Sequence, residues 1–149
     1  MKLSLFIPGI PKPKQSFRAR VMKSKSGKSF VHTYQTKEVV QQEKNIQIIV
    51  KEQLPKEFKI MENGIAVTKL WYIFLPITSM KKAYKEIINN GGYLIKTTKP
   101  DLTDNLNKGL FDALQGVLYL NDSQICSMDN VRKVYGKEPG IILELEEIL

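Results

Sequence analysis

Apolar and polar residues alternate along this chain with two different periods, and each period predicts a type of secondary structure. Runs with a period of two, rich in β-branched and aromatic residues, predict β-strands at residues 2–7, 17–23, 29–34, 65–74, 124–135 and 141–145. Apolar residues three and four positions apart predict helices at residues 36–53 and 81–90, and a third from after Pro100 to near Gly116. Because strands and helices interleave, we predict the fold class α/β (mixed α+β), with helices packed on a single mixed sheet.

Residues 17–23 and 29–34 are predicted to pair as a β-hairpin. Ser26-Gly27 lies between them, a dipeptide typical of tight turns. The hairpin and the proline-rich connector before it are basic. Their Lys and Arg residues are Lys12, Lys14, Arg18, Arg20, Lys23, Lys25 and Lys28. We predict that these seven side chains contact the phosphate backbone of a nucleic acid.

The net charge of +8 supports this prediction because it is unevenly distributed. Residues 1–37 contain nine Lys or Arg and no acidic residue, whereas the remaining residues contain 14 basic and 15 acidic ones. A surface that is charged only for solubility mixes both signs. A segregated positive segment instead indicates nucleic-acid binding.

The composition is typical of one globular domain that covers residues 1–149, with 42% hydrophobic and 26% charged residues. No apolar run approaches the roughly 20 residues that a membrane-spanning helix needs. The N-terminal residues do not resemble a signal peptide, so we predict a cytoplasmic protein without membrane contact. Cys126 is the only cysteine and His32 the only histidine, which excludes an internal disulfide and argues against a zinc site.

Residues 99–125, which we call the acidic segment, gather carboxylates in one part of this basic chain. In a regular helix, Asp104, Lys108 and Asp112 lie at roughly 0°, 40° and 80° around the axis. The leucines of the same helix lie at roughly 200° to 280°, on the opposite side: Leu106, Leu110 and Leu114. We therefore predict one buried face and one charged face. Asp101 precedes the helix, and Asp122 follows a short apolar run that can fold it back toward the helix start.

The residues alone leave two interpretations of these carboxylates open. Hard oxygen ligands beside a basic surface suit a phosphodiesterase that uses Mg²⁺ or Mn²⁺. Alternatively, Asp104, Lys108 and Asp112 form an ordinary ladder of ion pairs on a solvated face. In that case Asp101 or Thr103 simply caps the helix. Asp112 has a third possible role, in which it orients Lys108 or the helix without binding metal.

The order of these residues resembles the signature of the RusA family of Holliday-junction resolvases. That signature has a Pro-Asp-x-Asp-Asn segment, a helix with a lysine, an Asp-Ala-Leu and an Asp-Asp-x-Gln. Here the matching positions are residues 100–105, Lys108, Asp112-Ala-Leu and Asn121-Asp-Ser-Gln. The chain departs from the signature twice. One additional residue separates Asp101 from Asp104, and Asn121 stands where the family has another acid.

The resemblance implies a RusA-like fold and a crossover junction endodeoxyribonuclease, a hydrolase of DNA recombination and repair. It implies that Asp101, Asp104 and Asp122 bind Mg²⁺, with Mn²⁺ as an alternative, and that Lys108 completes the catalytic residues. It also implies a homodimer that acts on branched DNA, namely a four-way junction. The alternatives are a nuclease for flaps, forks or RNA, and a non-catalytic module that binds nucleic acid.

Overall fold

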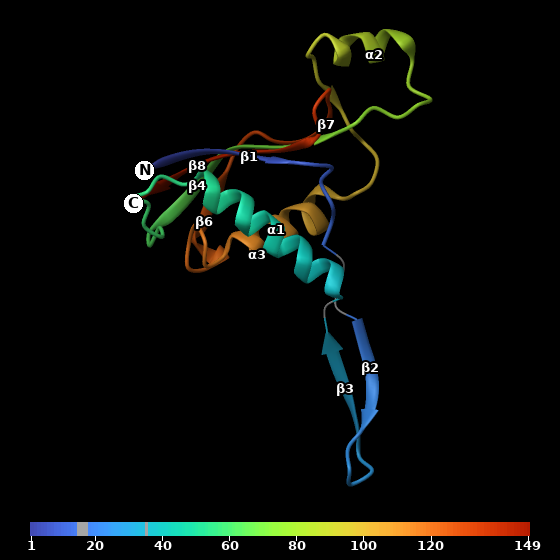
Figure 1. Cartoon of the computed structure of the whole chain (residues 1–149), viewed down its shortest axis with the longest axis vertical. Coiled ribbons are helices and arrows are strands. Elements are labelled where there is room, and N and C mark those ends of the chain that lie inside the picture. The colour runs from blue at the N-terminus through green and yellow to red at the C-terminus, as the bar shows by residue number, and fades with distance from the viewer. Residues whose placement is uncertain (15–17, 35) are drawn as a thin grey trace.

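The computed structural model describes residues 1–14, 18–34 and 36–149, and it shows a sheet with helices on one face (Figure 1). The strands are β1 (Lys2–Pro8), β2 (Arg18–Lys23), β3 (Ser29–Tyr34), β4 (Gly64–Phe74), β5 (Leu94–Ile95), β6 (Ile125–Met128), β7 (Val131–Tyr135) and β8 (Gly140–Ile148). The helices are α1 (Lys37–Gln53), α2 (Lys82–Asn89) and α3 (Asn107–Leu114). A π-helical turn, η1 (Leu102–Leu106), precedes α3, and a 3₁₀ turn, η2 (Asp122–Gln124), precedes β6.

Strand β4 is the centre of the main sheet. The strand order is β1-β8-β4-β7-β5, and β6 also pairs with β4. β8 is antiparallel to both β1 and β4, whereas β6 and β7 run parallel to β4. The sheet is therefore mixed, which confirms the predicted fold class.

The hydrophobic core lies between one face of this sheet and helices α1 and α3, which lie on the same side of the sheet in Figure 1. Leu70 and Tyr72 of β4 and Leu143 of β8 belong to the buried face of the sheet. Val50 of α1 and Leu114 of α3 are fully buried in the same cluster. The alternating pattern of the strands places one apolar set of side chains against the helices.

Helix α1 confirms the helix predicted at residues 36–53. Thr36 is its N-cap, and the Thr36 Oγ1 accepts a hydrogen bond from the Val39 backbone N–H at 3.5 Å. This bond satisfies one of the N–H groups that the first helical turn leaves without a partner. The helix ends at Gln53, just before Pro55.

Membrane-spanning helices are absent from the part of the chain that the structure describes, because none of its helices has the length and apolar character that a bilayer requires.

The prediction of a single strand at residues 124–135 is wrong. The segment forms β6 and β7, which are separated at Asn130, whose φ of 52° lies in the left-handed region. Asparagine adopts this conformation more readily than most residues. The Asn130 carbonyl accepts from the Leu70 N–H at 3.0 Å, and its Oδ1 accepts from the Trp71 Nε1–H at 3.0 Å. The break is therefore held in place by two bonds to the central strand.

The predicted hairpin is confirmed over the residues that the structure describes. β2 and β3 pair antiparallel from Arg18↔Tyr34 to Lys23↔Ser29 and form a two-stranded sheet of their own. Phe17, the first residue of the predicted arm, lies outside the described residues. Figure 1 shows the hairpin projecting from one end of the molecule, whereas α2 lies at the other end. We call the β2–β3 hairpin the arm.

Candidate functional site

The acidic segment begins with a π turn in place of the regular helix that we predicted. Asp101 has an extended backbone, and the Leu106 N–H donates to its carbonyl at 3.2 Å, a bond that spans five residues. The α-helical part begins only at Asn107. A π turn accommodates one extra residue within a helix. It therefore explains how the additional residue between Asp101 and Asp104 fits without changing the helix that follows.

The predicted division into a buried and a charged face is confirmed. Leu106, Leu110 and Leu114 are each at most 2% exposed. Asp101, Asp104 and Lys108 are exposed, as is Asp122 in η2. Because the π turn lies between Asp101 and Asn107, the regular spacing of the helical wheel applies from Asn107 onward and not to Asp104.

The side chain of Asp101 does not act as a helix cap. Although Asp101 occupies the N-cap position of η1, its carboxylate makes no capping hydrogen bond within the described residues. Over the same residues, Asp101, Asp104 and Asp122 take part in no ion pair. Three exposed carboxylates thus stand without an ion-pair partner in the described part of a chain of net charge +8. The absence of a capping bond argues against the capping interpretation of the Asp101 side chain.

The turn that carries Asp122 is held by Gln124. The Gln124 Oε1 accepts from the N–H groups of Leu120 at 2.8 Å and Asn121 at 2.9 Å. Its Nε2 donates to the carbonyls of Met61 and Asn63, each at 2.9 Å. The Gln124 amide therefore fixes the turn on both sides, while the carboxylate of Asp122 remains exposed. Sequence reasoning included Gln124 only as part of a motif and missed this structural role.

Asn121, which departs from the family signature, has a local role in the same turn. Its Oδ1 accepts from the Ser123 N–H at 2.9 Å, which completes a capping box with Gln124. The Asp122 N–H donates to Gln115 Oε1 at 3.3 Å. These contacts bring the turn to the C-terminal end of α3, where Gln115 is the C-cap, and not to the helix start that we predicted.

A buried phenol lies between this turn and α3. The Tyr119 hydroxyl donates to the Phe111 carbonyl at 2.6 Å. Burial, and then the negative charges of Asp122 and Asp112, raise the pKa of Tyr119 far above its usual value. Tyr119 therefore remains neutral.

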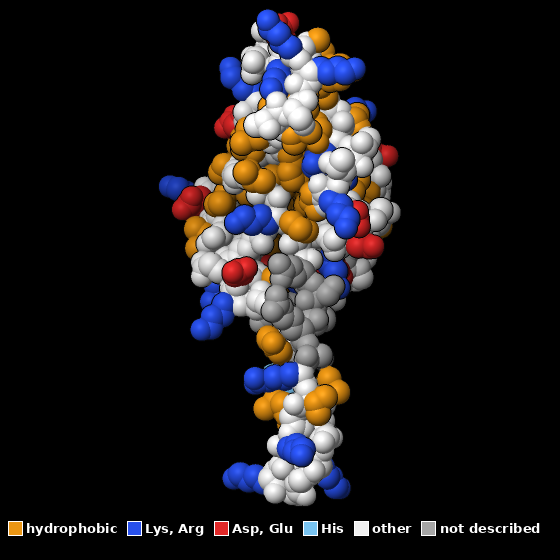
Figure 2. All heavy atoms as spheres, turned by 90° about the vertical axis from the view of Figure 1, so that its right-hand side faces the viewer, with side chains coloured by type: hydrophobic (Ala, Val, Ile, Leu, Met, Phe, Trp, Pro, Cys, Tyr) orange, Lys and Arg blue, Asp and Glu red, His pale blue; other side chains and the backbone are white. Residues whose placement is uncertain are grey.

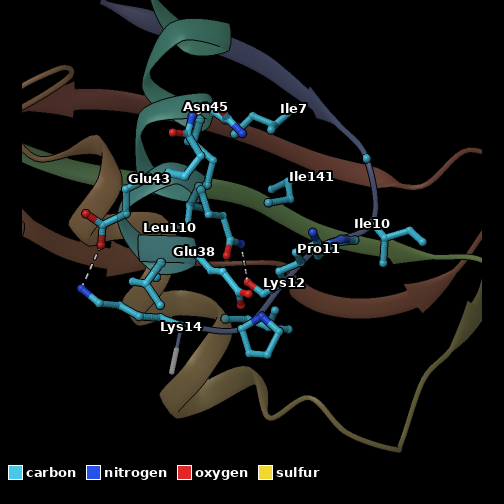
Figure 3. Close-up of a pocket in the computed structure, with 18 of the residues that line it drawn as sticks. Ile7, Ile10, Pro11, Lys12, Lys14, Glu38, Glu43, Asn45, Leu110 and Ile141 are labelled. Carbon is cyan, nitrogen blue, oxygen red and sulfur yellow. Dashed lines mark hydrogen bonds and ion pairs between the residues drawn. The ribbon is translucent and has the colours of Figure 1, made fainter. Parts of the chain in front are cut away.

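Asp112 is engaged with a lysine from a distant part of the chain. The Lys14 Nζ lies 2.8 Å from Asp112 Oδ2 and 2.9 Å from Glu43 Oε1. The side chain of Lys14 is only 11% exposed, and Figure 3 shows it reaching toward Glu43 of α1. Burial would lower the pKa of Lys14, but its hydrogen bonds and attraction to both carboxylates raise it overall. Lys14 is therefore a charged bridge between the connector and two helices.

The prediction that Lys14 contacts nucleic acid does not fit this geometry. Its ammonium is enclosed by two carboxylates, and its backbone N–H donates to the Asn105 carbonyl at 3.2 Å. A Cβ on Gly109 would approach the Lys14 Cβ to 3.0 Å, so the connector lies directly against α3. Asp112 is 98 residues away from Lys14 in sequence, which explains why a local charge pattern could not reveal this ion pair.

A cavity of about 1200 Å³ lies between the connector, α1 and α3 (Figure 3). Ile7, Pro11 and Ile141 line one part of it, and Lys12 and Glu38 another. The Gln42 Nε2 donates to the Lys12 carbonyl at 3.0 Å. Together with the ion pairs of Lys14, this bond attaches the connector to α1 and α3.

The basic residues of the arm remain candidates for nucleic-acid contact. Arg20, Lys23, Lys25 and Lys28 are exposed, as is Lys12 in the connector. Figure 2 shows the arm as a narrow projection with Lys and Arg side chains along it. The side chain of Arg18 lies outside the described residues.

The described residues contain no group of three or more His, Cys, Asp or Glu side chains that already converges on one metal position. The predicted ligands are thus present at the surface as separate carboxylates. Their chemistry, three exposed oxygen donors, suits a hard divalent cation, whereas Cys126 and His32 contribute nothing to such a group.

Comparison with known proteins identifies the family. The model of the family described as Endodeoxyribonuclease RusA matches residues 8–146, nearly the whole chain. The chain belongs to the RusA family.

A relative in Bacillus subtilis (strain 168) shares part of the sequence. The uncharacterized protein YqaN is 42% identical to this chain over 57 residues, which are 38% of this chain and 39% of YqaN. The match therefore spans about two fifths of each protein. Family membership rests on the RusA match and not on this shorter similarity.

Proposed function

We propose that this RusA-family chain is a Mg²⁺-dependent endonuclease that resolves Holliday junctions. The observation that carries the proposal is the set of three exposed carboxylates without ion-pair partners among the described residues, Asp101, Asp104 and Asp122, in a strongly basic nuclease. A basic arm on the same chain provides the positive surface that a polyanion needs.

In this proposal Asp101, Asp104 and Asp122 would hold one or two divalent cations with contributions from both subunits of a dimer, and Mn²⁺ could replace Mg²⁺. When bound, the cation activates a water molecule and stabilises negative charge on the phosphate that is cut. Gln124 keeps the Asp122 turn in place through its four hydrogen bonds. Lys108, exposed on α3, neutralises charge on the phosphate or on the leaving oxygen.

The arm and the carboxylates have separate tasks in this mechanism. Arg20, Lys23, Lys25 and Lys28 neutralise backbone phosphates and position the DNA, which requires charge but no base recognition. A four-way junction has two-fold symmetry and two strands to cut. We therefore propose a homodimer, in which each subunit directs one site toward one strand and both subunits contribute to the bound cations.

The test is cleavage of a four-way junction, a plain duplex, a forked duplex, a flap and a single strand, each end-labelled and incubated with Mg²⁺ or with EDTA. The proposal expects paired nicks in the junction, with Mg²⁺ only. Preferential cleavage of the fork or flap would identify a nuclease for other branched DNA. Tight binding in EDTA, with no nick in any substrate after incubation with Mg²⁺, would identify a non-catalytic binding module.

A further inference from the structure

Three polar side chains converge beside the start of the acidic segment. The Lys96 Nζ lies 2.8 Å from Thr98 Oγ1 and 3.3 Å from the Tyr135 hydroxyl. The two hydroxyl oxygens are 3.5 Å apart. Lys96 and Thr98 follow β5, and Tyr135 ends β7, so two neighbouring strands supply the group.

A second lysine fixes the backbone of this region. The Lys133 Nζ donates to the Thr98 carbonyl at 2.6 Å and to the Pro100 carbonyl at 2.8 Å. Pro100 directly precedes Asp101, the first proposed cation ligand. The group formed by Lys96, Thr98 and Tyr135 is thus held at a fixed position next to the proposed site of cleavage.

The directions of the hydrogen bonds leave donors available at this group. An ammonium has only donors, so the hydroxyls of Thr98 and Tyr135 accept from Lys96. The two hydroxyls also hydrogen-bond to each other, so one of their two O–H groups remains available to a ligand. One positive charge and one hydroxyl donor therefore lie together, which is the complement of a phosphate oxygen.

The charge of Lys96 is not neutralised by a carboxylate of the described residues. Over those residues neither Lys96 nor Lys133 has a carboxylate partner; Lys96 otherwise lies over two aromatic rings, with its Nζ 5.2 Å from the Phe74 centroid and 4.9 Å from that of Tyr135. Thr98 is exposed and Lys96 is half-buried, so an anion has access to these two side chains, whereas Tyr135 is only 8% exposed. The hydrogen bond with Thr98, together with the ammonium groups of Lys96 and Lys133, lowers the pKa of Tyr135 against the opposing effect of burial.

We propose that Lys96, Thr98 and Tyr135 form a binding site for one backbone phosphate of the DNA, next to the phosphate that is cut. This inference rests on the proposed nuclease function, because it places the phosphate on the same strand that enters the carboxylate site. Lys133 is a positioning residue in this arrangement, since its ammonium holds the backbone that carries Thr98 and leads to Asp101. None of these four residues belongs to the basic arm.

The test combines protein variants with single uncharged phosphates. Methylphosphonates replace the phosphates around the junction one at a time, and binding is measured in EDTA so that no cleavage occurs. With the wild-type chain, neutralising the phosphate that occupies the site weakens binding. With Lys96→Gln the same replacement has no further effect, because the variant protein and the modified DNA each lack one partner of the same interaction.

The expected decrease in affinity for Lys96→Gln on unmodified DNA is roughly tenfold, as for one hydrogen bond to a charged group. The slope of log K against log salt falls by about 0.9. Thr98→Val and Tyr135→Phe each remove one O–H, and each decreases affinity less than Lys96→Gln does. Both act at the same phosphate as Lys96→Gln. The control is Lys85→Gln on α2, because Lys85 likewise donates to a threonine, in its case to the Thr78 carbonyl at 2.6 Å. This control retains the full wild-type profile.

The outcomes separate this inference from the proposed function. If the wild-type chain binds the junction but Lys96→Gln keeps its sensitivity at every phosphate, the phosphate site is refuted and the nuclease proposal stands. If Lys96→Gln and Lys85→Gln change the profile equally, the effect is one of general charge, and the site is also refuted. If the wild-type chain does not bind the junction, both proposals fail.

Discussion

The acidic segment and the basic arm differ in how much of the protein holds them in place. In the acidic segment, Gln124 alone makes four hydrogen bonds to backbone groups, and Leu106 and Leu110 are buried in the core. The arm is a separate two-stranded sheet whose central pair, Val21 and Val31, is 71% and 66% exposed. Chemistry at a phosphate requires fixed groups, whereas neutralising a charged backbone requires only charge within reach.

The comparison also applies to individual lysines. Lys14 is nearly enclosed and bound to two carboxylates, whereas Lys23, Lys25 and Lys28 are exposed. All four lie in the same basic stretch of sequence. The structure therefore divides one run of positive charge into a residue that holds the connector against the helices and residues that remain exposed.

The largest expected effect comes from the carboxylates. Asp104→Asn and Asp122→Asn each remove one negative oxygen ligand, so we expect junction cleavage to fall to the level seen in EDTA. Binding is retained or tightened, because repulsion of phosphate is removed. The measurement is single-turnover cleavage alongside binding in EDTA. Asp129→Asn is the control, as Asp129 is an exposed carboxylate in the turn between β6 and β7; near wild-type cleavage by both test variants would overturn the metal site.

Lys108 is expected to have the next largest effect. If its ammonium stabilises the transition state, Lys108→Ala slows cleavage by about 10²- to 10³-fold with little change in thermal stability. Lys108→Arg restores little, because a planar guanidinium does not occupy the position of a compact ammonium. Single-turnover rates and thermal unfolding of both variants provide the test. Normal rates with a lowered melting temperature would show that Lys108 acts only in an ion-pair ladder.

The exposed lysines of the arm are expected to affect binding and not the chemical step. Changing Lys23, Lys25 and Lys28 together to Gln lowers the slope of log K against log salt by about 0.9 for each phosphate that the arm no longer neutralises. The cleavage rate at saturating enzyme changes little. A triple change of the exposed Lys51, Lys56 and Lys59 is the control. Equal slopes for the two triple variants would place the DNA surface away from the arm.

Lys14, in contrast to the arm lysines, is expected to affect the stability of the fold and not DNA binding. Lys14→Met leaves Asp112 and Glu43 facing each other without a cation, so the free energy of unfolding falls by about 1–3 kcal/mol. Adding Asp112→Asn recovers part of this stability because it removes the repulsion. The salt slope of DNA binding is unchanged. Lys12→Met, on the exposed part of the same connector, is the control. If Lys14→Met lowers the salt slope of DNA binding and leaves the stability unchanged, Lys14 belongs to the DNA surface.

Much of the fold and the order of the site residues could be predicted from the sequence. The helix boundary at Thr36, the hairpin and the buried leucines of α3 depend on local periodicity, which a sequence displays directly. The break at Asn130 and the bridge from Lys14 to Asp112 depend on partners that are far away in the chain. Local patterns do not contain those contacts, so the first was predicted as continuous strand and the second as DNA binding.

The π turn was missed for a related reason. Leu110 and Leu114 report only the register of the helix after the insertion, and that register is regular; Leu106, the last residue of the π turn, is buried as well. An extra residue upstream changes neither the apolar spacing nor the composition. Only the comparison of Asp101 and Asp104 with the family signature indicated that a residue had been added, and the π turn is the structural form of that addition.

The smallest expected effect tests this account of the insertion. Deleting the exposed Thr103 restores the family spacing between Asp101 and Asp104 and should convert η1 into regular α-helix. Because the extra residue is absorbed within the π turn, α3 and its leucines stay in place, and cleavage should remain within about threefold of wild type. Deleting Lys108's neighbour Gly109 is the control, since it rotates the rest of α3 by about 100° and exposes Leu110 and Leu114. Circular dichroism and single-turnover cleavage measure both variants. Equal damage from the two deletions would mean that the π turn itself is required, and that the arrangement of Asp101 and Asp104 in this chain differs from that of the family signature.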